Sequence, residues 1–444
     1  MTTFLDRTAR EWAVLRCPTC GNAFDADDVR DACDCGGLLD VIHRRPPIEG
    51  DALRRTVETF GPPPTAVDDP RADPPPARHD AARWQSGVWR FAPIVCAHGP
   101  AVTWPEGNTP LVSRASVTAY AGVHALQLKH EGMNPTGSFK DRGMTVAMSR
   151  ARATGARAVA CASTGNTAAS LAAYAALAGI PALVLVPDGK VAAGKLAQAT
   201  AYGAKTLLVD GDFDDCLRLA RDASRSLGVY LANSVNPWRI EGQKTICWEL
   251  LMQRGWHPPD WIALPAGALG NTAALGKALR EAKELGVLPF MPRILSVQAT
   301  GAAPFAQGFA ARFRERVTVR AETIASAIRI GDPASWHRAV RAIRETDGVV
   351  TAVTDADILD AKAVIDAAGV GCEPASAASV AGVRAMRAAG VIGEDDSVVC
   401  ILTGNLLKDP DTTATYHGGN QPRSNAPIRI GASLTDVERI LAAH

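Results

Sequence analysis

The sequence predicts an α/β protein whose parallel β-sheets are covered by helices on both faces. Short runs of consecutive apolar residues, such as 182–186 and 294–299, have the length of strands and lack the alternation of a half-exposed strand. Ala-rich stretches of helical length separate these runs. At 444 residues, 47% of them hydrophobic, the chain is long enough for two or three domains with buried cores.

The elements of this fold are expected between about residues 106 and 410. The pattern predicts helices at 168–179, 214–228 and 272–286, and strands at 182–186, 206–210, 261–267, 294–299 and 397–404. Sheets of this kind bind their ligands at the carboxyl ends of the strands.

The segment at 46–105 is rich in Pro and Asp. We expect it to form an extended arm on the surface, and a partly disordered linker is the alternative for 61–80.

Four cysteines lie in the segment 1–45, in the pattern C-x2-C followed by C-x-C. Two short thiol pairs at this separation can supply a tetrahedral sulfur site, so we expect a zinc-ribbon-like module. Four thiolates leave no open position, and the zinc would be structural. A metal-free knuckle and a redox pair are the alternatives. The expected ligands are Cys17, Cys20, Cys33 and Cys35.

The composition excludes several classes of protein. A net charge of +1 argues against binding nucleic acid through bulk charge. No apolar run reaches the roughly 20 residues of a membrane helix, and the first residues lack a secretory pattern. The other six cysteines are scattered, which is not a disulfide framework. We therefore expect a cytoplasmic protein.

The most informative stretch is NPTGSFKDRG at 134–143, which contains Lys140. A desolvated lysine among small and hydroxyl residues can act as a Schiff-base nucleophile and then as a proton shuttle. A lysine beside Asp141 and Arg142 is by itself more often an ion-pair residue. The whole stretch, however, resembles the lysine motif of fold type II pyridoxal-phosphate enzymes, in the form found in threonine synthases.

Further motifs resemble the same family and follow in its order. The resemblance spans roughly 104–410 and includes EGNTPL at 106–111, STGNT at 163–167, NSVNPWRIEGQKT at 233–245, TIASAIRIGDPASW at 323–336 and EPASAA at 373–378. It implies a fold type II enzyme with two three-layer αβα domains and parallel-rich sheets. The implied large cofactor-binding domain is 106–145 with 233–430, and the small domain is 146–232. A homodimer is also implied.

The resemblance implies pyridoxal 5′-phosphate as the cofactor, attached to Lys140. Asn166 would face its phenolic oxygen, and the turn between strand 261–266 and the next helix would cradle its phosphate. Thr403 would face the pyridine nitrogen, where a hydroxyl is expected to leave the nitrogen uncharged. The turn consists of Gly267, Ala268, Leu269, Gly270 and Asn271.

The substrate implied by the family is a phosphorylated amino acid, O-phospho-L-homoserine. Its carboxylate would lie over Ser163, Thr164, Asn166 and Thr167, a segment that would otherwise be an ordinary helix cap. Its phosphate would be bound by Asn233, Ser234 and Arg239, with a surface ion pair to Glu241 as the alternative for Arg239.

The implied reaction is that of a carbon–oxygen lyase acting on phosphates, in which water converts the substrate to L-threonine and phosphate. The sequence departs from the family pattern on the side of the site. Ala268 and Leu269 replace Asn and Ala, Asn405 and Leu406 replace His and Gly, and Trp238 replaces Tyr. A related pyridoxal-phosphate β- or γ-replacement enzyme, with another nucleophile or with O-phosphoserine as in cysteate synthase, is therefore the alternative.

Overall fold

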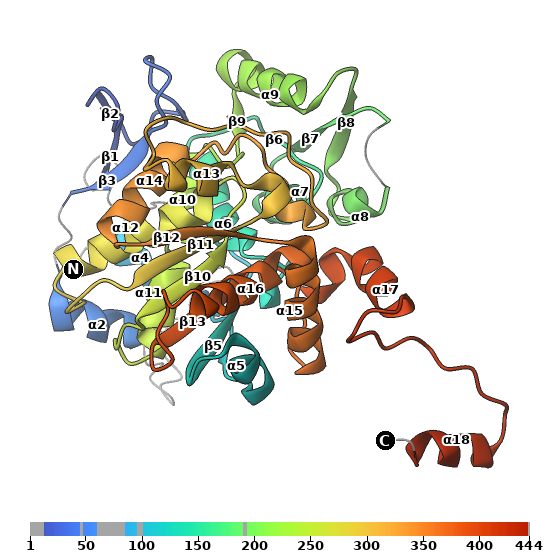
Figure 1. Ribbon diagram of the computed structural model, residues 1–444. Coiled ribbons are helices and arrows are strands. Elements are labelled where there is room, and N and C mark those ends of the chain that lie inside the picture. Colours follow the sequence, from blue (N-terminus) through green and yellow to red (C-terminus); the bar gives the residue numbers. More distant parts are fainter. Residues whose placement is uncertain (1–12, 45–47, 60–84, 96–100, 190–192, 443–444) are drawn as a thin grey trace, which may run out of the picture.

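The computed structural model describes residues 13–44, 48–59, 85–95, 101–189 and 193–442. It contains three sheets (Figure 1). The largest has the strand order β12-β11-β10-β13-β5-β4, and all its pairs are parallel except β4 with β5. Its strands are β4 (Leu111–Val112), β5 (Ala125–His130), β10 (Trp261–Pro265), β11 (Arg293–Ala299), β12 (Val349–Val353) and β13 (Ser397–Leu402).

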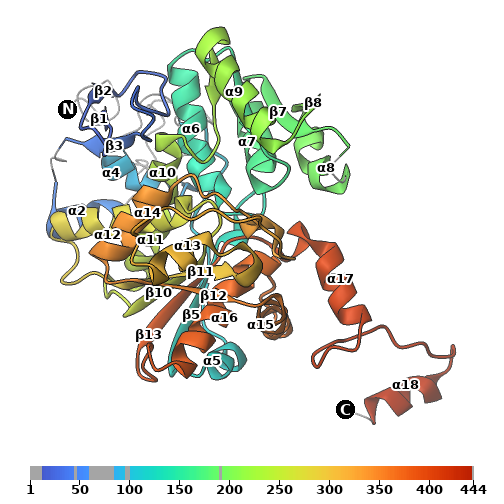
Figure 2. The same ribbon diagram turned by 45° about the horizontal axis from the view of Figure 1, so that its top comes forward.

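Both faces of this sheet are buried, as the unbroken apolar runs predict. Along β10, Ile262 and Leu264 pack into one core, whereas Trp261 and Ala263 pack into the core on the other face. The first face is covered by α10 (Pro237–Gln243), α11 (Thr245–Gln253), α12 (Gly270–Glu284), α13 (Pro304–Ala310) and α14 (Trp336–Glu345). The second is covered by α5 (Ala115–Ala121), α15 (Asp355–Ala367) and α16 (Pro374–Ala388) (Figure 2).

A smaller, fully parallel sheet has the order β8-β7-β6-β9. Its strands are β6 (Ala158–Ala162), β7 (Ala182–Pro187), β8 (Lys205–Val209) and β9 (Val229–Leu231). The helices around it are α6 (Lys140–Ala153), α7 (Asn166–Ala178), α8 (Ala193–Ala201) and α9 (Phe213–Leu227). α9 begins with a capping box at Asp212 and Asp215 and covers the opposite face from α6 and α7.

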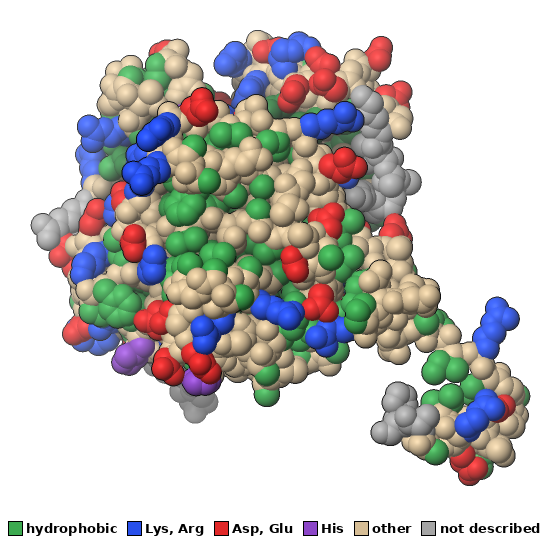
Figure 3. All heavy atoms as spheres, in the orientation of Figure 1, with side chains coloured by type: hydrophobic (Ala, Val, Ile, Leu, Met, Phe, Trp, Pro, Cys, Tyr) green, Lys and Arg blue, Asp and Glu red, His purple; other side chains and the backbone are tan. Residues whose placement is uncertain are grey.

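The third sheet is antiparallel, has the order β2-β1-β3, and holds the cysteine cluster. Its strands are β1 (Ala13–Arg16), β2 (Ala23–Asp25) and β3 (Asp40–His43). On the face drawn in Figure 3, Lys and Arg side chains lie among Asp and Glu side chains, in keeping with the small net charge.

Within the described parts of 46–105, residues 50–58 and 89–95 are helical, so the predicted extended arm is wrong for them, whereas 101–105 contains no helix or strand. α2 (Gly50–Glu58) buries Leu53 and Val57, and η1 (Trp89–Phe91) and α4 (Ala92–Val95) are buried in the main core. The Pro-rich stretch at 61–80 lies outside the described residues.

The remaining short helices are η2 (Glu131–Met133), η3 (Thr300–Ala302), η4 (Ser326–Ile328) and η5 (Leu406–Lys408). After them, α17 (Pro410–Gly418) and α18 (Leu434–Leu441) lead away from the body of the protein (Figure 1). Within the described residues, every helix is too short or too polar to cross a bilayer.

Candidate active site

Lys140 is the first residue of α6, and its loop is joined to the end of β13. Phe139 N donates to Thr403 O at 3.0 Å, and Ser138 pairs with Gly404. The predicted nucleophile and the predicted pyridine-facing residue are therefore brought together at a carboxyl strand end. Burial, with a smaller contribution from the charge of Arg239, lowers the pKa of the Lys140 amine to about 7. A large fraction of the amine is then neutral and nucleophilic near neutral pH.

Asp141 and Arg142 hold the start of α6 instead of pairing with Lys140. Asp141 accepts hydrogen bonds from Thr136 N at 2.7 Å, Thr136 Oγ1 at 2.6 Å and Ser170 Oγ at 2.6 Å. Arg142 forms fully buried ion pairs with Glu131 at 2.7 Å and with Glu249 at 2.8 Å. These contacts fix the loop that precedes Lys140, and no carboxylate of the described residues forms an ion pair with its amine.

Asn166 and Thr403 both donate hydrogen bonds to the side chain of Glu373, a residue to which the sequence analysis assigned no role. Asn166 Nδ2 donates to Glu373 Oε2 at 2.9 Å, and Thr403 Oγ1 donates to Glu373 Oε1 at 3.1 Å. Glu373 lies just before α16 in the EPASAA motif and is 4% exposed. Burial raises the pKa of its carboxyl group, although both hydrogen bonds act in the opposite direction. The EPASAA motif pointed to this segment in the sequence, but it did not indicate which side chains Glu373 contacts.

The turn 267–271 joins β10 to α12 with the geometry of an anion cradle. Leu269 has a φ of +66°, and no side chain caps the helix that follows. A Cβ at Gly267 would lie 3.1 Å from Ala327 O, so the backbone passes close to the segment at η4. Asn271 is 6% exposed, and both its amide atoms lack a partner among the described residues. Free N–H groups at the start of a 15-residue helix fit a phosphate.

Arg239, on α10, is buried without a carboxylate partner among the described residues. Its side chain is 1% exposed, and Nη1 donates to Ala232 O at 2.9 Å. Nε and Nη2 have no hydrogen-bond partner there. Burial lowers the pKa of this guanidinium to about 10. The predicted alternative of a surface pair with Glu241 is wrong, because Glu241 pairs with Lys244 at 2.6 Å.

The other residues predicted to bind substrate follow β6 and β9, at the carboxyl ends of these two strands of the small sheet. Ser163 and Thr164, between β6 and α7, and Thr167, in the first turn of α7, are half-buried, and the N-cap of α7 is Gly165, which has no side-chain cap. Asn233 is engaged elsewhere, because its amide bonds both the N–H and the carbonyl of Ala162 at 3.0 Å. Ser234 is half-buried next to it. The structure thus leaves hydroxyl and guanidinium groups, rather than the Asn233 amide, available to a ligand.

A cavity of about 360 Å³ lies beside the lysine loop, lined by residues 132–137, Gln198, Asn405, Leu407 and Lys408. Lys408 Nζ donates to Gln198 Oε1 at 2.6 Å, which connects η5 to α8. Asn405, one of the departures from the family pattern, donates from its backbone N to Gly137 O at 2.9 Å. Its amide accepts from Leu407 N at 3.0 Å. Asn405 therefore holds the loop before Lys140 through its backbone. Gln198 and Lys408, which lie in stretches that resemble the family but were assigned no role there, line the same cavity.

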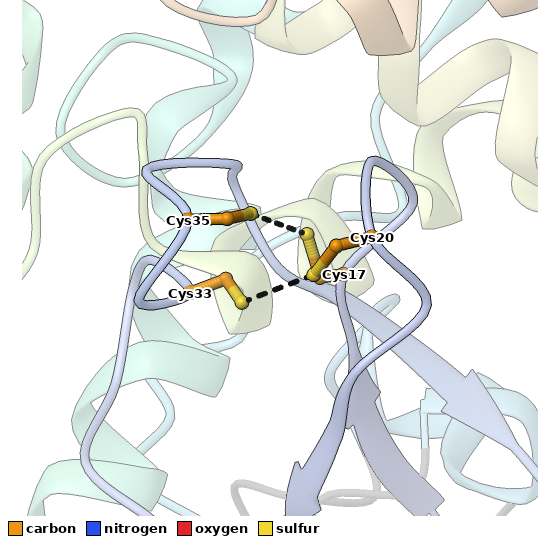
Figure 4. Close-up of side chains that lie close together, drawn as sticks. All are labelled: Cys17, Cys20, Cys33 and Cys35. Atoms are coloured by element: carbon orange, nitrogen blue, oxygen red, sulfur yellow. Dashed lines mark hydrogen bonds between the residues drawn. The ribbon is translucent and has the colours of Figure 1, made fainter.

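The four predicted metal ligands meet between two turns of the N-terminal sheet (Figure 4). Their Sγ atoms all lie within 4.8 Å of one another, with Cys17 to Cys35 and Cys20 to Cys33 at 3.5 Å. A Cβ at Gly37 would lie 2.8 Å from Cys17 Sγ, so only glycine permits this approach.

Comparison with known proteins agrees with this geometry. The family model described as pyridoxal-phosphate dependent enzyme matches residues 102–404. The chain is 44% identical to the threonine synthase of Methanosarcina acetivorans over 90% of this chain and 93% of that protein. It is 49% identical to the threonine synthase of Mycobacterium tuberculosis over 81% and 98%.

Among solved structures, threonine synthase from Escherichia coli matches with a TM-score of 0.64 and 18% identity, covering 94% of this chain and 95% of that one. Maize serine racemase matches with a TM-score of 0.58 and 25% identity over 70% and 91%. The likeness to the Escherichia coli enzyme shows the fold type II architecture. Because the matches in sequence extend over nearly the whole chain, this protein belongs to the threonine synthase family of pyridoxal-phosphate-dependent enzymes.

Proposed function

We propose that this protein is a threonine synthase, a pyridoxal-phosphate-dependent lyase that converts O-phospho-L-homoserine and water to L-threonine and phosphate. The observation that carries the proposal is Arg239, whose buried guanidinium has two nitrogens free for an anion and acts electrostatically on Lys140. The turn 267–271 offers a separate phosphate cradle. A cofactor phosphate and a substrate phosphate can therefore be bound at different places.

The residues present fit the cofactor. Lys140 would attach it, Asn166 and Thr403 would contact its ring, and the turn 267–271 with Asn271 would bind its phosphate. When bound, pyridoxal phosphate supplies an electron sink that stabilises negative charge developing at the substrate Cα.

The chain itself supplies proton transfer and positioning. The neutral Lys140 amine takes a proton from the substrate Cα, gives it up, and then takes one from Cβ, for which a pKa near 7 is suited; in the product the two protons stand at Cα and Cγ. Arg239 holds the phosphate while its bond to Cγ breaks, and a water molecule adds at Cβ. Ser163, Thr164 and Thr167 orient the substrate carboxylate at the start of α7.

The test is product analysis with cofactor-loaded protein, supplied separately with O-phosphohomoserine, O-phosphoserine and threonine. We expect threonine and phosphate in equal amounts from O-phosphohomoserine, and neither from Lys140→Ala. Phosphate without threonine, or turnover of O-phosphoserine alone, would contradict the proposal. That outcome would favour the second candidate, a β- or γ-replacement enzyme, which the absence of an amide at Ala268 supports.

We also propose that Cys17, Cys20, Cys33 and Cys35 bind one structural zinc ion. Tetrahedral zinc with Zn–S bonds of about 2.3 Å requires sulfurs roughly 3.8 Å apart, close to the observed 3.5 Å pairs. Metal analysis should give about one zinc per chain, lost in Cys20→Ser. A stoichiometry near zero in protein purified without chelators would contradict this assignment.

Three further statements are proposals of the same kind. The sheet strands support a large domain of 106–145 with 233–430, a small domain of 146–232, and a module of 1–45 preceding the segment 46–105. The unpaired cysteines of the described chain fit a cytoplasmic enzyme. A homodimer is expected from the family, and sedimentation at micromolar concentration would test it.

A further inference from the structure

The end of the described chain, 424–442, forms an arm that leaves the body of the protein, and we call it the C-terminal arm. Arg423 anchors its start, because Nε donates to Asp360 Oδ1 at 2.8 Å and the guanidinium lies 5.7 Å from the ring centre of Tyr120. From this anchor the arm, with α18 near its end, leads away from the sheets in both ribbon views (Figure 1, Figure 2). The arm therefore starts from a fixed point and points outward.

The C-terminal arm exposes a row of aliphatic side chains. Leu434, Val437 and Leu441 follow one another at the spacing of one helix face, and they are 73%, 41% and 70% exposed. Ile428 and Ile430 are exposed in the segment before the helix. None of these side chains belongs to the hydrophobic cores of the described residues. In Figure 3 the end of the arm accordingly forms a separate lobe with hydrophobic side chains on its surface.

The helix of this arm is specified by its own sequence. Ser433 is the N-cap and accepts from Asp436 N at 3.2 Å, and Asp436 Oδ2 accepts from Gly431 N at 2.9 Å. A helix of eight residues is nevertheless marginal in water, so most of its stability has to come from the packing of its apolar face. Among the described residues of the same chain this face has no such packing. The surface that covers it therefore lies outside the described part of this chain.

Charge and size indicate what this surface is. The arm contains as many arginines as acidic residues, so it offers no net charge to nucleic acid or to an anionic bilayer. These residues are Arg429, Asp436, Glu438 and Arg439. A neutral aliphatic face fits an apolar protein surface instead. A stable interface uses roughly 20–30 residues a side, and two exchanged arms with their receiving surfaces supply a set of this size from each chain. Because homo-oligomers close by symmetry, a copy that receives an arm also returns one.

We propose that the C-terminal arm docks on a second copy of this chain and that the reciprocal exchange of two arms holds a dimer together. The face formed by Leu434, Val437 and Leu441 is the main contact, and the segment with Ile428 and Ile430 extends it toward the anchor at Arg423. The homodimer expected from the family thereby acquires a defined contact. This contact is independent of the reaction proposed above, and its tests need no turnover.

The first test is analytical ultracentrifugation of the purified full chain with Leu434→Ala and Leu441→Ala combined. Both side chains are exposed in the single chain, so the fold should be unaffected, and alanine favours the helix. The dissociation constant of the dimer should rise about 100-fold or more, because each arm loses two buried leucines. Thr435→Ala combined with Arg439→Ala, on the opposite side of α18, is the matched control and should leave the constant unchanged. A monomeric unaltered chain at micromolar concentration, or a leucine variant that dimerises as tightly, would overturn the proposal.

Hydrogen–deuterium exchange of the unaltered protein distinguishes docking on a second copy from folding back onto the same chain. The backbone amides of α18 should be protected at concentrations above the dissociation constant of the dimer and should exchange freely below it. Protection that persists in the monomer would overturn the proposal and place the arm on its own chain. A dimer in which α18 stays unprotected would also overturn it and leave the helix face to a different protein.

Discussion

Replacing Arg239 by methionine should separate substrate binding from stability. The guanidinium is 1% exposed, and Nε and Nη2 lack partners among the described residues. Methionine keeps an unbranched apolar stem in the same space and removes the charge. We therefore expect catalysis to be impaired and the ligand-free fold to be strengthened by the same substitution.

The two effects can be estimated from the structure. Hydrogen bonds to a charged group contribute about 1.5–3 kcal/mol each, so two bonds to a substrate phosphate are worth roughly 3–6 kcal/mol. At 1.4 kcal/mol per factor of ten, kcat/KM should fall by about 10²–10⁴. The lowered pKa of Arg239 corresponds to roughly 3 kcal/mol of unfavourable burial. After subtracting about 1 kcal/mol for the bond to Ala232 O, the free energy of unfolding of the ligand-free variant should rise by about 2 kcal/mol.

Three measurements test this expectation. Phosphate release gives kcat/KM, titration of the visible absorbance gives cofactor affinity, and urea unfolding of ligand-free protein gives stability. Arg225→Met, at an exposed position on α9, is the control and should change none of them. Equal losses of substrate and cofactor affinity, or a lower urea midpoint, would refute the reasoning, because Arg239 would then hold the cofactor phosphate or the fold.

Further predictions concern the lysine and the cysteines. Lys140→Ala should abolish turnover and the visible absorbance of the bound cofactor; a variant that keeps both would show that another amine is the attachment site. The rate of cofactor incorporation into ligand-free protein should rise with pH, reach half its maximum near pH 7 and level off about one pH unit higher, because only the neutral Lys140 amine reacts and burial lowers its pKa to about 7. The rate can be measured by stopped-flow absorbance, and a pH profile with its midpoint near pH 10 would contradict this pKa. Removing metal with a chelator, or Cys20→Ser, should lower the midpoint of thermal unfolding by about 5 °C or more, measured by calorimetry. Thr19→Ser, in the same exposed turn, is the control, and equal midpoints for all three proteins would exclude a stabilising metal.

Five of the ten strands in the two larger sheets, β7, β8, β10, β11 and β13, were predicted from the sequence, and the other five were not. The expected strand at 206–210 is Lys205–Val209, and the expected strand at 294–299 is Arg293–Ala299. Both segments are short apolar runs between helices. Burial on both faces explains the missing alternation in Arg293–Ala299, whereas Lys205–Val209 is an edge strand in which Leu207 is 40% and Leu208 63% exposed. The helices in 46–105 were not predicted, because the Pro- and Asp-rich composition of that segment hides the few apolar residues, such as Leu53 and Trp89, that bury it.

The candidate site could be predicted in its residue types but not in its contacts. Thr403 and Asn166 were expected at the cofactor, yet the residue that joins them, Glu373, is 207 positions from Asn166 in the chain. Asn166 and Glu373 come together only because the starts of α7 and α16 lie close to each other in the fold. Asn233 is the reverse case, a residue that was predicted to bind a ligand but whose side chain is already engaged. The resemblance predicted that Asn233 binds the substrate phosphate. In the structure its amide is instead hydrogen-bonded to the backbone of β6.

The position of the cysteine module could not be read from the sequence, and it lies against the helices that begin at the site. Asp40 on β3 accepts from Arg338 of α14 at 2.8 Å, and Val41 O accepts from Lys277 of α12 at 2.5 Å. α12 is the helix that starts at the phosphate turn. On α6, whose first residue is Lys140, Arg150 donates to Ala26 O at 2.8 Å.

The strongest of these links reaches the helix of Arg239. His43, at the end of β3, lies 2.5 Å from the buried Glu241 of α10 and 3.0 Å from Lys244 Nζ. Glu241 also pairs with Lys277, so β3, α10 and α12 share one buried charge network. Burial lowers the pKa of His43, so its link to Glu241 is a hydrogen bond to a buried charge, which contributes about 1.5–3 kcal/mol. The network therefore allows few relative positions of the module and α10. For this reason a loss of order around the cysteines is expected to shift Arg239 as well as to lower the free energy of unfolding.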